Sequence, residues 1–265
     1  MYPAPDSTSS SKQQAPRILV VGAGALGCAA LRTLARDGRA RVTVVDDDVV
    51  ERSNLQRQVL YTDADIGRSK VAAVATSLAR DPGIAVETVA ARLDTASGPS
   101  LVASADLVLD ATDDPATKFL LNRLCVGAGV AYVYGGVVRT GGQWMLVVPG
   151  ETACLECVFP APAPGAVESA EGCSAMGVLA PVAGLVGAMQ ALTALAFLAR
   201  MRRPARDAGR LHVYELTGAR SRHVDFSPAA GCFCRSAGRV ARDVEEADRI
   251  GSDAEREEEE RRKAS

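Results

Sequence analysis

The sequence predicts an α/β fold in which a doubly wound, mainly parallel sheet carries helices on both of its faces. Three observations predict this class. Short apolar runs rich in valine and leucine, typical of strands buried on both faces, alternate with longer alanine- and leucine-rich segments. A glycine-rich turn joins the first of these strands to the first helix. The 265 residues, 48% of them hydrophobic, are enough to form one substantial core.

The elements are expected in a regular β-α-β order. The first strand is expected at residues 17–21, before the glycine turn at 22–27 and a helix that runs to about residue 36. Further strands are expected at 42–45, 84–88, 107–110 and 130–134, and further helices at 70–80 and 115–127. Because the strands of such a series run parallel, their carboxyl ends meet at one edge, where a Rossmann-like fold binds nucleotides.

After residue 141 the pattern changes from alternating strands and helices to late antiparallel strands. These strands are expected at 144–148, 211–215 and 222–226. The domain is expected to span residues 17–238. A disordered segment rich in Ser, Pro and Gln is expected before it, at 1–16, and a highly charged tail after it, at 239–265.

The stretch between Cys173 and Arg200 contains no charged residue and is long enough to span a bilayer. Glycines and a proline interrupt it, however, and a helix buried on all sides, for instance in a dimer interface, explains the same composition. Gly184 and Gly187 would let another helix approach closely. We therefore expect a buried helix and no membrane span.

Composition excludes several classes of function. A formal net charge of −2 argues against a nucleic acid partner, which calls for a basic surplus. The two histidines, His212 and His223, both come late, so an acid/base mechanism based on histidine is not expected. The N-terminal stretch lacks the apolar core of a signal peptide, and close cysteine pairs in a reducing compartment favour metal ligands over disulfides. We expect a cytoplasmic protein.

The glycine turn is suited to binding phosphate. Gly22 allows the tight turn, Gly24 lets the backbone approach phosphate oxygens, and Gly27 lets the helix pack on the strand. The amides at the start of the helix then present a positive end to an anion. Asp46, at the end of the second strand, is placed to meet ribose hydroxyls. On this motif alone, an NAD-dependent enzyme is the alternative interpretation.

A polar cluster after Asp46 favours a triphosphate over a nicotinamide, since a dehydrogenase needs only one acid there. Its members are Asp48, Ser53, Asn54, Arg57, Gln58 and Lys70. Arg57 and Lys70 can neutralise charge on the α-phosphate of ATP while a carboxylate attacks it. The alternative is that these two residues form only a solvated basic surface.

Two acids follow the strand at 107–110. Asp113 can hold Mg²⁺ against the phosphates, because carboxylate oxygens at the carboxyl end of a strand suit this ion. Asp114, immediately before a proline, suits the N-cap of the next helix.

Four cysteines occur as two close pairs. Cys154 and Cys157 have standard ligand spacing, whereas Cys232 and Cys234 form a tighter C-x-C pair. Four thiolates would bind Zn²⁺ tetrahedrally and link the late strands to the core. Buried free thiols, or a redox pair at Cys154 and Cys157, are the alternatives.

The pattern D-x-D-x-V-x-x-S-N-L-Q-R-Q at residues 46–58 resembles the ThiF/MoeB/HesA family of ubiquitin-activating-like adenylyltransferases. The resemblance covers roughly residues 17–235. It implies that the chain binds Mg-ATP, adenylates the C-terminal glycine of a small ubiquitin-fold sulfur carrier protein ending in Gly-Gly, and releases pyrophosphate. It also implies a homodimer, and a separate sulfur donor is expected.

Cys173 lies in a C-x-x-x-G-V-[LM]-x-P segment that is also similar to this family. The resemblance implies that its thiol can form a thioester or an acyl-disulfide with the carrier, as in members that move sulfur. Together with Arg57, Lys70 and Asp113, it completes the expected catalytic set.

The sequence departs from the family at two places. Ala25 stands where many relatives have a further glycine, although a backbone contact to the nucleotide survives that change. A Ser/Pro/Gln stretch stands where relatives carry a helical arginine that reaches the partner subunit's ATP. Two alternatives therefore remain: adenylation of a peptide or tRNA-linked carboxylate, and a non-catalytic partner subunit or NAD-binding module.

Overall fold

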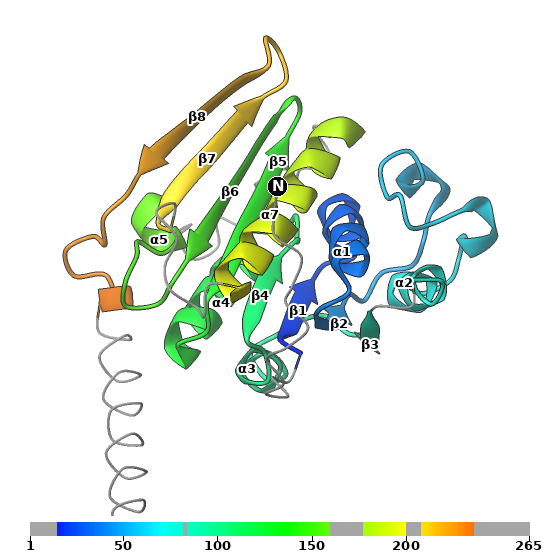
Figure 1. The fold of residues 1–265 in the computed structure, drawn as a ribbon, viewed down its shortest axis with the longest axis horizontal. Coiled ribbons are helices and arrows are strands. Elements are labelled where there is room, and N and C mark those ends of the chain that lie inside the picture. The colour runs from blue at the N-terminus through cyan, green and yellow to red at the C-terminus, as the bar shows by residue number, and fades with distance from the viewer. Residues whose placement is uncertain (1–14, 82–83, 160–176, 200–207, 236–265) are drawn as a thin grey trace, which may run out of the picture.

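The fold is built on an eight-stranded sheet with the order β3-β2-β1-β4-β5-β6-β7-β8 (Figure 1). The computed structural model describes residues 15–81, 84–159, 177–199 and 208–235. The strands are β1 (Arg17–Val21), β2 (Arg41–Val45), β3 (Ala85–Val89), β4 (Leu107–Asp110), β5 (Tyr132–Val138), β6 (Gly141–Val147), β7 (Arg210–Glu215) and β8 (Arg220–Asp225). The helices are α1 (Ala25–Asp37), α2 (Lys70–Leu78), α3 (Gly98–Ala103), α4 (Pro115–Ala128), α5 (Leu155–Val158) and α7 (Ala180–Ala199), with 3₁₀ turns η1 (Arg52–Asn54) and η2 (Asp63–Asp65).

Strands β1 to β5 pair in parallel, and β6, β7 and β8 are added antiparallel, which confirms the predicted fold class. In the register of the sheet, Val21 at the end of β1 faces both Val45 of β2 and Asp110 of β4. The loops that follow these three strands therefore leave the sheet from the same edge.

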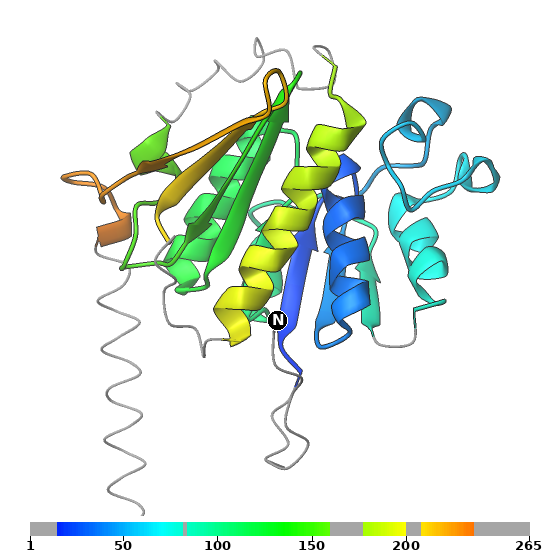
Figure 2. The same ribbon diagram turned by 45° about the horizontal axis from the view of Figure 1, so that its top comes forward.

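Helices cover both faces of the sheet. The apolar side chains of α1, α2 and α7 form one core with Ile18, Val20 and Val44, and Figure 2 shows these three helices in front of the sheet. The side chains of α3, α4 and α5 form the second core with alternate residues of the same strands, including Leu19 and Val108. This alternation explains why the parallel strands read as continuous apolar runs.

The uncharged segment folds as α7, which packs against α1 and against β4, β5 and β6. A Cβ at Gly187 would lie 2.3 Å from the Leu26 carbonyl oxygen of α1, so glycine permits this close approach. The helix is long and apolar enough to cross a membrane, but 44% of its most apolar window is buried here, and core helices pass the same test. It is not buried on all sides in the single chain, because Leu185 and Leu192 remain 37% and 50% exposed.

Several element boundaries differ from those expected. Strands β5 and β6 extend to a tight hairpin turn at Arg139 and Thr140, where Arg139 adopts a φ of 52°. Glycines concealed these strand ends, because glycine weakens the strand pattern. The glycines have a packing reason: a Cβ at Gly135 would lie 2.4 Å from the Gln190 side chain, and one at Gly142 would lie 2.4 Å from Val186. Helices α3 and α5 and both 3₁₀ turns were not anticipated.

Candidate functional site

The loops after β1, β2 and β4 meet at the carboxyl edge of the sheet. The backbone N–H of Ala23 donates to Asp46 Oδ2 at 2.7 Å, which joins the first loop to the second. A Cβ at Gly22 would lie 2.6 Å from the Ala111 carbonyl oxygen, so the first loop also touches the third. The structure thus brings the glycine turn, Asp46 and the segment that leads to Asp113 together, as expected.

The glycine turn presents an open helix N-terminus. Gly22 has a φ of 98°, and a Cβ at Gly27 would lie 2.0 Å from the Gly22 carbonyl oxygen, so both positions need glycine. Helix α1 begins at Ala25 with Gly24 as N-cap, no side-chain cap and no acid in its first turn. A Cβ at Gly24 would meet nothing within 4 Å. The first amides of α1 are therefore available to an anion.

Asp46 is fixed by backbone donors on both oxygens. Besides the bond from Ala23, its Oδ1 accepts the N–H of Asp48 at 2.9 Å. Burial raises the pKa of Asp46, although the positive charge of Lys70 and the two backbone hydrogen bonds oppose this effect. A carboxylate held in this way keeps free lone pairs that can accept hydroxyl protons.

Lys70 opens α2 and reaches back toward the second loop. Its ammonium lies 2.6 Å from Asp48 Oδ2, and its side chain is 8% exposed, whereas that of Asp48 is 65% exposed. The N–H of Lys70 also donates to the Asp48 carbonyl at 2.9 Å. The structure therefore places a largely buried cation beside Asp46 and Asp48.

The remaining polar residues lie in the loop after β2. Asn54 is buried and caps η1 through the N–H of Glu51, while its amide donates to Ser53 Oγ at 3.3 Å. The Arg57 guanidinium donates to the Ser53 carbonyl at 2.9 Å. Gln58 is buried, and its Oε1 has no hydrogen-bond partner among the described residues. In this structure Arg57 thus bonds to its own loop.

Tyr61 connects this loop to the glycine turn and was missed from sequence. Its hydroxyl donates to the Ala23 carbonyl at 2.7 Å. Burial raises the pKa of Tyr61, so the hydroxyl keeps the proton that it donates. Tyr61 directly follows Val59 and Leu60, so the sequence alone presents it as one more hydrophobic residue of the loop and gives no signal for this contact.

The two acids before α4 differ in their contacts, and only the predicted cap is observed. Asp114 caps α4, accepting the N–H groups of Ala116 and Thr117, as expected. Asp113 is exposed and makes no hydrogen bond or ion pair with another residue of the described part of the chain. It belongs to none of the clusters of three or more potential metal ligands found among the described residues. A single carboxylate is nevertheless enough for Mg²⁺ that is also bound by phosphates.

Asp110 and Lys118 form a buried ion pair at the base of this site that the sequence did not predict. The Lys118 ammonium lies 3.2 Å from both Asp110 oxygens and also donates to the Gly135 carbonyl. The sequence signal for this pair is weak: a lysine in the apolar run of a helix, eight positions after an acid that ends a strand.

The four cysteines form one cluster, as predicted. The Sγ atom of Cys154 lies 3.8 Å from that of Cys157 and 3.6 Å from that of Cys232. The Sγ atoms of Cys157 and Cys234 are also 3.6 Å apart. All four ligand atoms lie within 4.8 Å of one another. Four thiolates at about 2.3 Å from a tetrahedral Zn²⁺ are separated by about 3.8 Å, so the cluster fits this ion and the C-x-C spacing does not prevent it.

The chemistry of the donor set also fits a cation. Burial raises the pKa of Cys154 to about 12, so this thiol is protonated at neutral pH unless a cation compensates the charge of the thiolate. The N–H of Ala229 donates to Cys157 Sγ at 3.3 Å, a typical contact around metal-binding sulfur. Cys173 lies outside the described residues.

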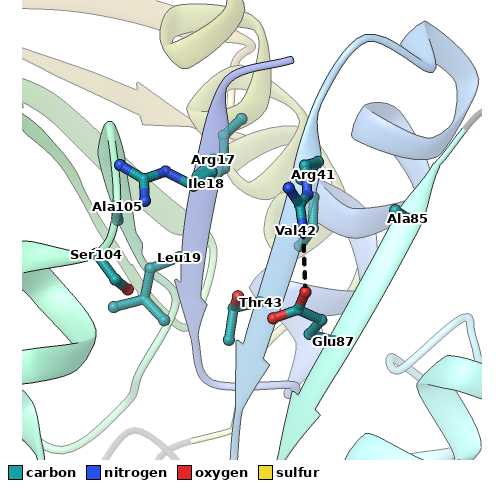
Figure 3. A pocket seen from close by; sticks show the side chains of 10 residues that line it. All are labelled: Arg17, Ile18, Leu19, Arg41, Val42, Thr43, Ala85, Glu87, Ser104 and Ala105. Carbon is teal, nitrogen blue, oxygen red and sulfur yellow. Dashed lines mark hydrogen bonds and ion pairs between the residues drawn. The ribbon is translucent and has the colours of Figure 1, made fainter. Parts of the chain in front are cut away.

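A separate pocket lies at the opposite edge of the sheet, away from the nucleotide loops. It has a volume of about 250 Å³ and lies between the starts of β1, β2 and β3 and the end of α3. Figure 3 shows the Arg41 side chain of β2 turned toward Glu87 of the neighbouring strand β3. The two form an ion pair of 3.3 Å. Arg17 is likewise paired with an acid, Asp106. Because its charges are balanced, we assign the pocket no role.

Comparison with known proteins gives consistent matches. The sequence profile of the ThiF family matches residues 6–234. The molybdopterin-synthase adenylyltransferase of Escherichia coli is 38% identical over 221 residues, which are 82% of this chain and 85% of that protein. The SAMP-activating enzyme E1 of Haloferax volcanii is 43% identical over 165 residues, which are 62% of this chain and only 61% of that protein.

Among solved structures, E. coli MccB in complex with MccA-N7isoASN has a TM-score of 0.71 and 22% sequence identity. The superposition covers 83% of this chain and 67% of that chain. The likeness shows a shared fold.

Proposed function

Because the chain belongs to the ThiF family, we propose that it uses ATP to adenylate the C-terminal glycine of a small ubiquitin-fold sulfur carrier protein. Pyrophosphate is released, and the carrier is primed for thiocarboxylate formation. The names of the relatives support the reaction type. The observation that carries the proposal is the convergence, at one sheet edge, of an uncapped helix N-terminus, Asp46 and the ion pair of Lys70 with Asp48.

Adenylation requires stabilisation of the developing charge more than it requires proton transfer. A carboxylate oxygen of the carrier bonds to the α-phosphorus of ATP, the bond to the bridging oxygen of the β-phosphate breaks, and pyrophosphate leaves with the bonding electrons. The attacking carboxylate is already ionised near neutral pH, so the reaction needs no protein base. The absence of histidine from this site is therefore consistent with the proposal.

Each group of the site receives a role. The first amides of α1, from Gly24 and Ala25 onward, bind phosphate oxygens, and Asp46 accepts the ribose hydroxyls. Lys70 and Arg57 oppose the charge that develops around the α-phosphate. Both keep donors beyond those used by Asp48 and the Ser53 carbonyl, because an ammonium has three N–H donors and a guanidinium five.

Two metal ions fit the residues present. Asp113 would hold Mg²⁺, which neutralises phosphate charge. The four-cysteine cluster would hold structural Zn²⁺, which joins the α5 segment to the segment after β8. We also propose that the protein is cytoplasmic, because close cysteine pairs serve as metal ligands where thiols stay reduced.

We also propose that the chain forms a homodimer and receives sulfur from a separate donor. The exposed leucines of α7 support the dimer, because an apolar helix face at the surface favours burial against a partner. Light scattering of the purified full chain tests it, and a monomer at micromolar concentration would contradict it.

ATP–pyrophosphate exchange tests the proposed reaction. We expect exchange only when a ubiquitin-fold protein ending in Gly-Gly is added, and we expect Asp113→Ala to abolish it. A carrier truncated by its last glycine is the control and should support no exchange. Exchange supported instead by a short peptide would favour the peptide-adenylating alternative. The absence of ATP binding would contradict the enzymatic proposal as a whole.

Cys173 is proposed to act after adenylation: its thiolate attacks the acyl carbon of the adenylate, a thioester forms, and AMP leaves. Cys173→Ala should therefore leave pyrophosphate exchange unchanged and reduce thiocarboxylate formation, measured by the mass of the carrier. Equal loss of both activities would contradict this order of steps. Unchanged thiocarboxylate formation would show that the acyl group passes to sulfur directly.

A further inference from the structure

We propose that Lys118 is a positioning residue of the nucleotide site, which acts through Asp110 to hold the loop at residues 111–113 and with it Asp113. The inference rests on the proposed function, because it takes Asp113 as the ligand of nucleotide-bound Mg²⁺. It adds a second layer of residues behind that ligand.

Lys118 joins three elements below the loop. It projects from α4, its ammonium lies 3.2 Å from both oxygens of Asp110 at the end of β4, and it donates to the Gly135 carbonyl of β5. The two side chains are 11% and 0% exposed. The ammonium also lies 5.0 Å from the centre of the Tyr134 ring, a distance at which the ring face attracts a cation.

Asp110 in turn holds the loop after β4 through hydrogen bonds from Thr112. Its Oδ1 accepts the Thr112 hydroxyl at 2.7 Å and the Thr112 N–H at 3.2 Å. Its carbonyl accepts the side-chain amide of Gln190 at 2.7 Å, so α7 holds the backbone at the same residue. The residue immediately before Asp113 is thus held by a carboxylate that is itself held by Lys118.

The residue after Asp113 is held as well. Asp114 accepts two N–H groups of α4 and the Thr117 hydroxyl at 2.6 Å. Asp113 is exposed between two anchored neighbours and makes no hydrogen bond or ion pair of its own within the described part of the chain, so its position depends on theirs. A buried carboxylate keeps its bonds best when a cation compensates it, and Lys118 is the cation in contact with Asp110.

The alternative is that the pair of Lys118 and Asp110 only stabilises the fold. The two roles differ in one respect. A stabilising role affects nucleotide binding with and without Mg²⁺ equally, whereas a positioning role affects the part of nucleotide binding that requires Mg²⁺. Partners behind a metal ligand typically contribute about 10–100-fold to metal affinity.

The experiment compares wild type, Lys118→Met, Lys118→Arg and the control Tyr132→Phe. Tyr132 donates a buried hydrogen bond of 2.7 Å to Asn122, which also joins β5 to α4 but does not involve the Asp110 side chain. The full chain is titrated with a fluorescent ATP analogue in a weak chelator, which removes Mg²⁺ but leaves the ion of the cysteine cluster in place, and then with Mg²⁺ at fixed nucleotide. Thermal unfolding of each variant checks that it is folded at the assay temperature.

We expect Lys118→Met to bind nucleotide in chelator as wild type does, and to need about 10–100-fold more Mg²⁺ for the tighter complex. Lys118→Arg should restore most of the Mg²⁺ affinity, because its guanidinium can bond both oxygens of Asp110. Tyr132→Phe should leave the Mg²⁺ requirement unchanged. A folded Lys118→Met with the Mg²⁺ requirement of wild type, or with equal losses in chelator and in Mg²⁺, would overturn the proposal.

A second variant, Thr112→Val, tests the proposal independently if Lys118→Met does not fold. It removes only the hydroxyl bond to Asp110 and leaves the ion pair intact. We expect it to raise the Mg²⁺ requirement in the same direction, and an unchanged requirement would overturn the proposal. The wild-type titration separates this inference from the proposed function: Mg²⁺-dependent nucleotide binding without carrier-dependent exchange contradicts the carrier reaction and leaves the Lys118 comparison readable. No nucleotide binding by wild type would overturn both.

Discussion

Lys70 is a largely buried cation of the proposed site. Its ammonium is largely buried beside Asp48 and lowers the electrostatic cost of an anion nearby. We predict that Lys70→Ala reduces carrier-dependent pyrophosphate exchange by about 10²–10³-fold, the usual effect of removing one preorganised group that stabilises developing charge. Arg52→Ala is the matched control, because it removes an exposed pair with Asp63 and should leave exchange unchanged. A Lys70→Ala enzyme with wild-type exchange would refute the role.

Asp46 should make nucleotide affinity depend on pH. Because burial raises its pKa, the carboxyl takes up a proton at a higher pH than an ordinary aspartate and then loses its capacity to accept ribose hydroxyls. ATP affinity should fall as the pH is lowered through this raised pKa. In Asp46→Asn, ATP affinity should no longer depend on pH in this range. Titration of ATP binding between neutral and acidic pH measures it.

The same raised pKa fixes the sign of the stability effect of Asp46. A carboxyl whose pKa is higher in the folded chain favours folding when protonated. Its contribution is fully present below the unfolded pKa and is lost as the pH rises through the folded value. The carboxyl therefore lowers stability at the neutral pH where the proposed site needs it ionised.

Single residues were predictable where their role is local. The glycine turn, Asp46, the cap at Asp114 and the cysteine pairs follow from motif spacing. Tyr61, Lys118 and Gln190 were not assigned roles, because their partners lie far along the chain and become neighbours only after folding. A sequence motif contains only residues that are close along the chain. These contacts depend instead on the tertiary packing of α4, α7 and the loop after β2.

At the level of elements, the contact between α1 and α7 provides a matched pair of substitutions. Gly187→Ala would place a Cβ 2.3 Å from the Leu26 carbonyl oxygen and should cost about 1–3 kcal/mol, the usual cost of overpacking. Gly184→Ala in the same helix meets nothing within 4 Å and should stabilise by up to about 1 kcal/mol through helix propensity. Urea unfolding of the two variants measures both. Effects of equal sign would contradict the packing described here.

The elements that were predicted best are the buried parallel strands. Their residues are apolar on both faces of the sheet, so the apolar runs are continuous. The bounds of β1, β2 and β4 were therefore predicted to within one residue. The hairpin of β5 and β6 was predicted too short, because glycines that accommodate Gln190 and Val186 carry no strand signal. Helix α3 was missed because it has six residues, too few to show a helical period.

For the whole molecule, the four-cysteine cluster predicts a metal-dependent stability. Removal of the ion by a strong chelator should lower the Tm by about 10 °C or more, given the stabilisation expected from a tightly bound ligand and the Tm sensitivity of a domain of this size. Cys157→Ser should abolish metal content, measured by elemental analysis. Cys125→Ala, which removes a buried thiol outside the cluster, should lower the Tm without changing the metal content. An identical Tm with and without metal would contradict the structural role.

The position of the cluster along the chain also affects how the protein is made. Cys154 and Cys157 precede α7, β7 and β8, whereas Cys232 and Cys234 follow them, almost at the end of the family match. On the ribosome, where domains fold from the N-terminus onward, the nucleotide loops emerge long before the last two sulfurs. A nascent chain could therefore hold a formed nucleotide edge while its cluster offers only two ligands. Four-sulfur coordination is therefore possible only after synthesis has passed Cys234, when nearly all of the family match has been made.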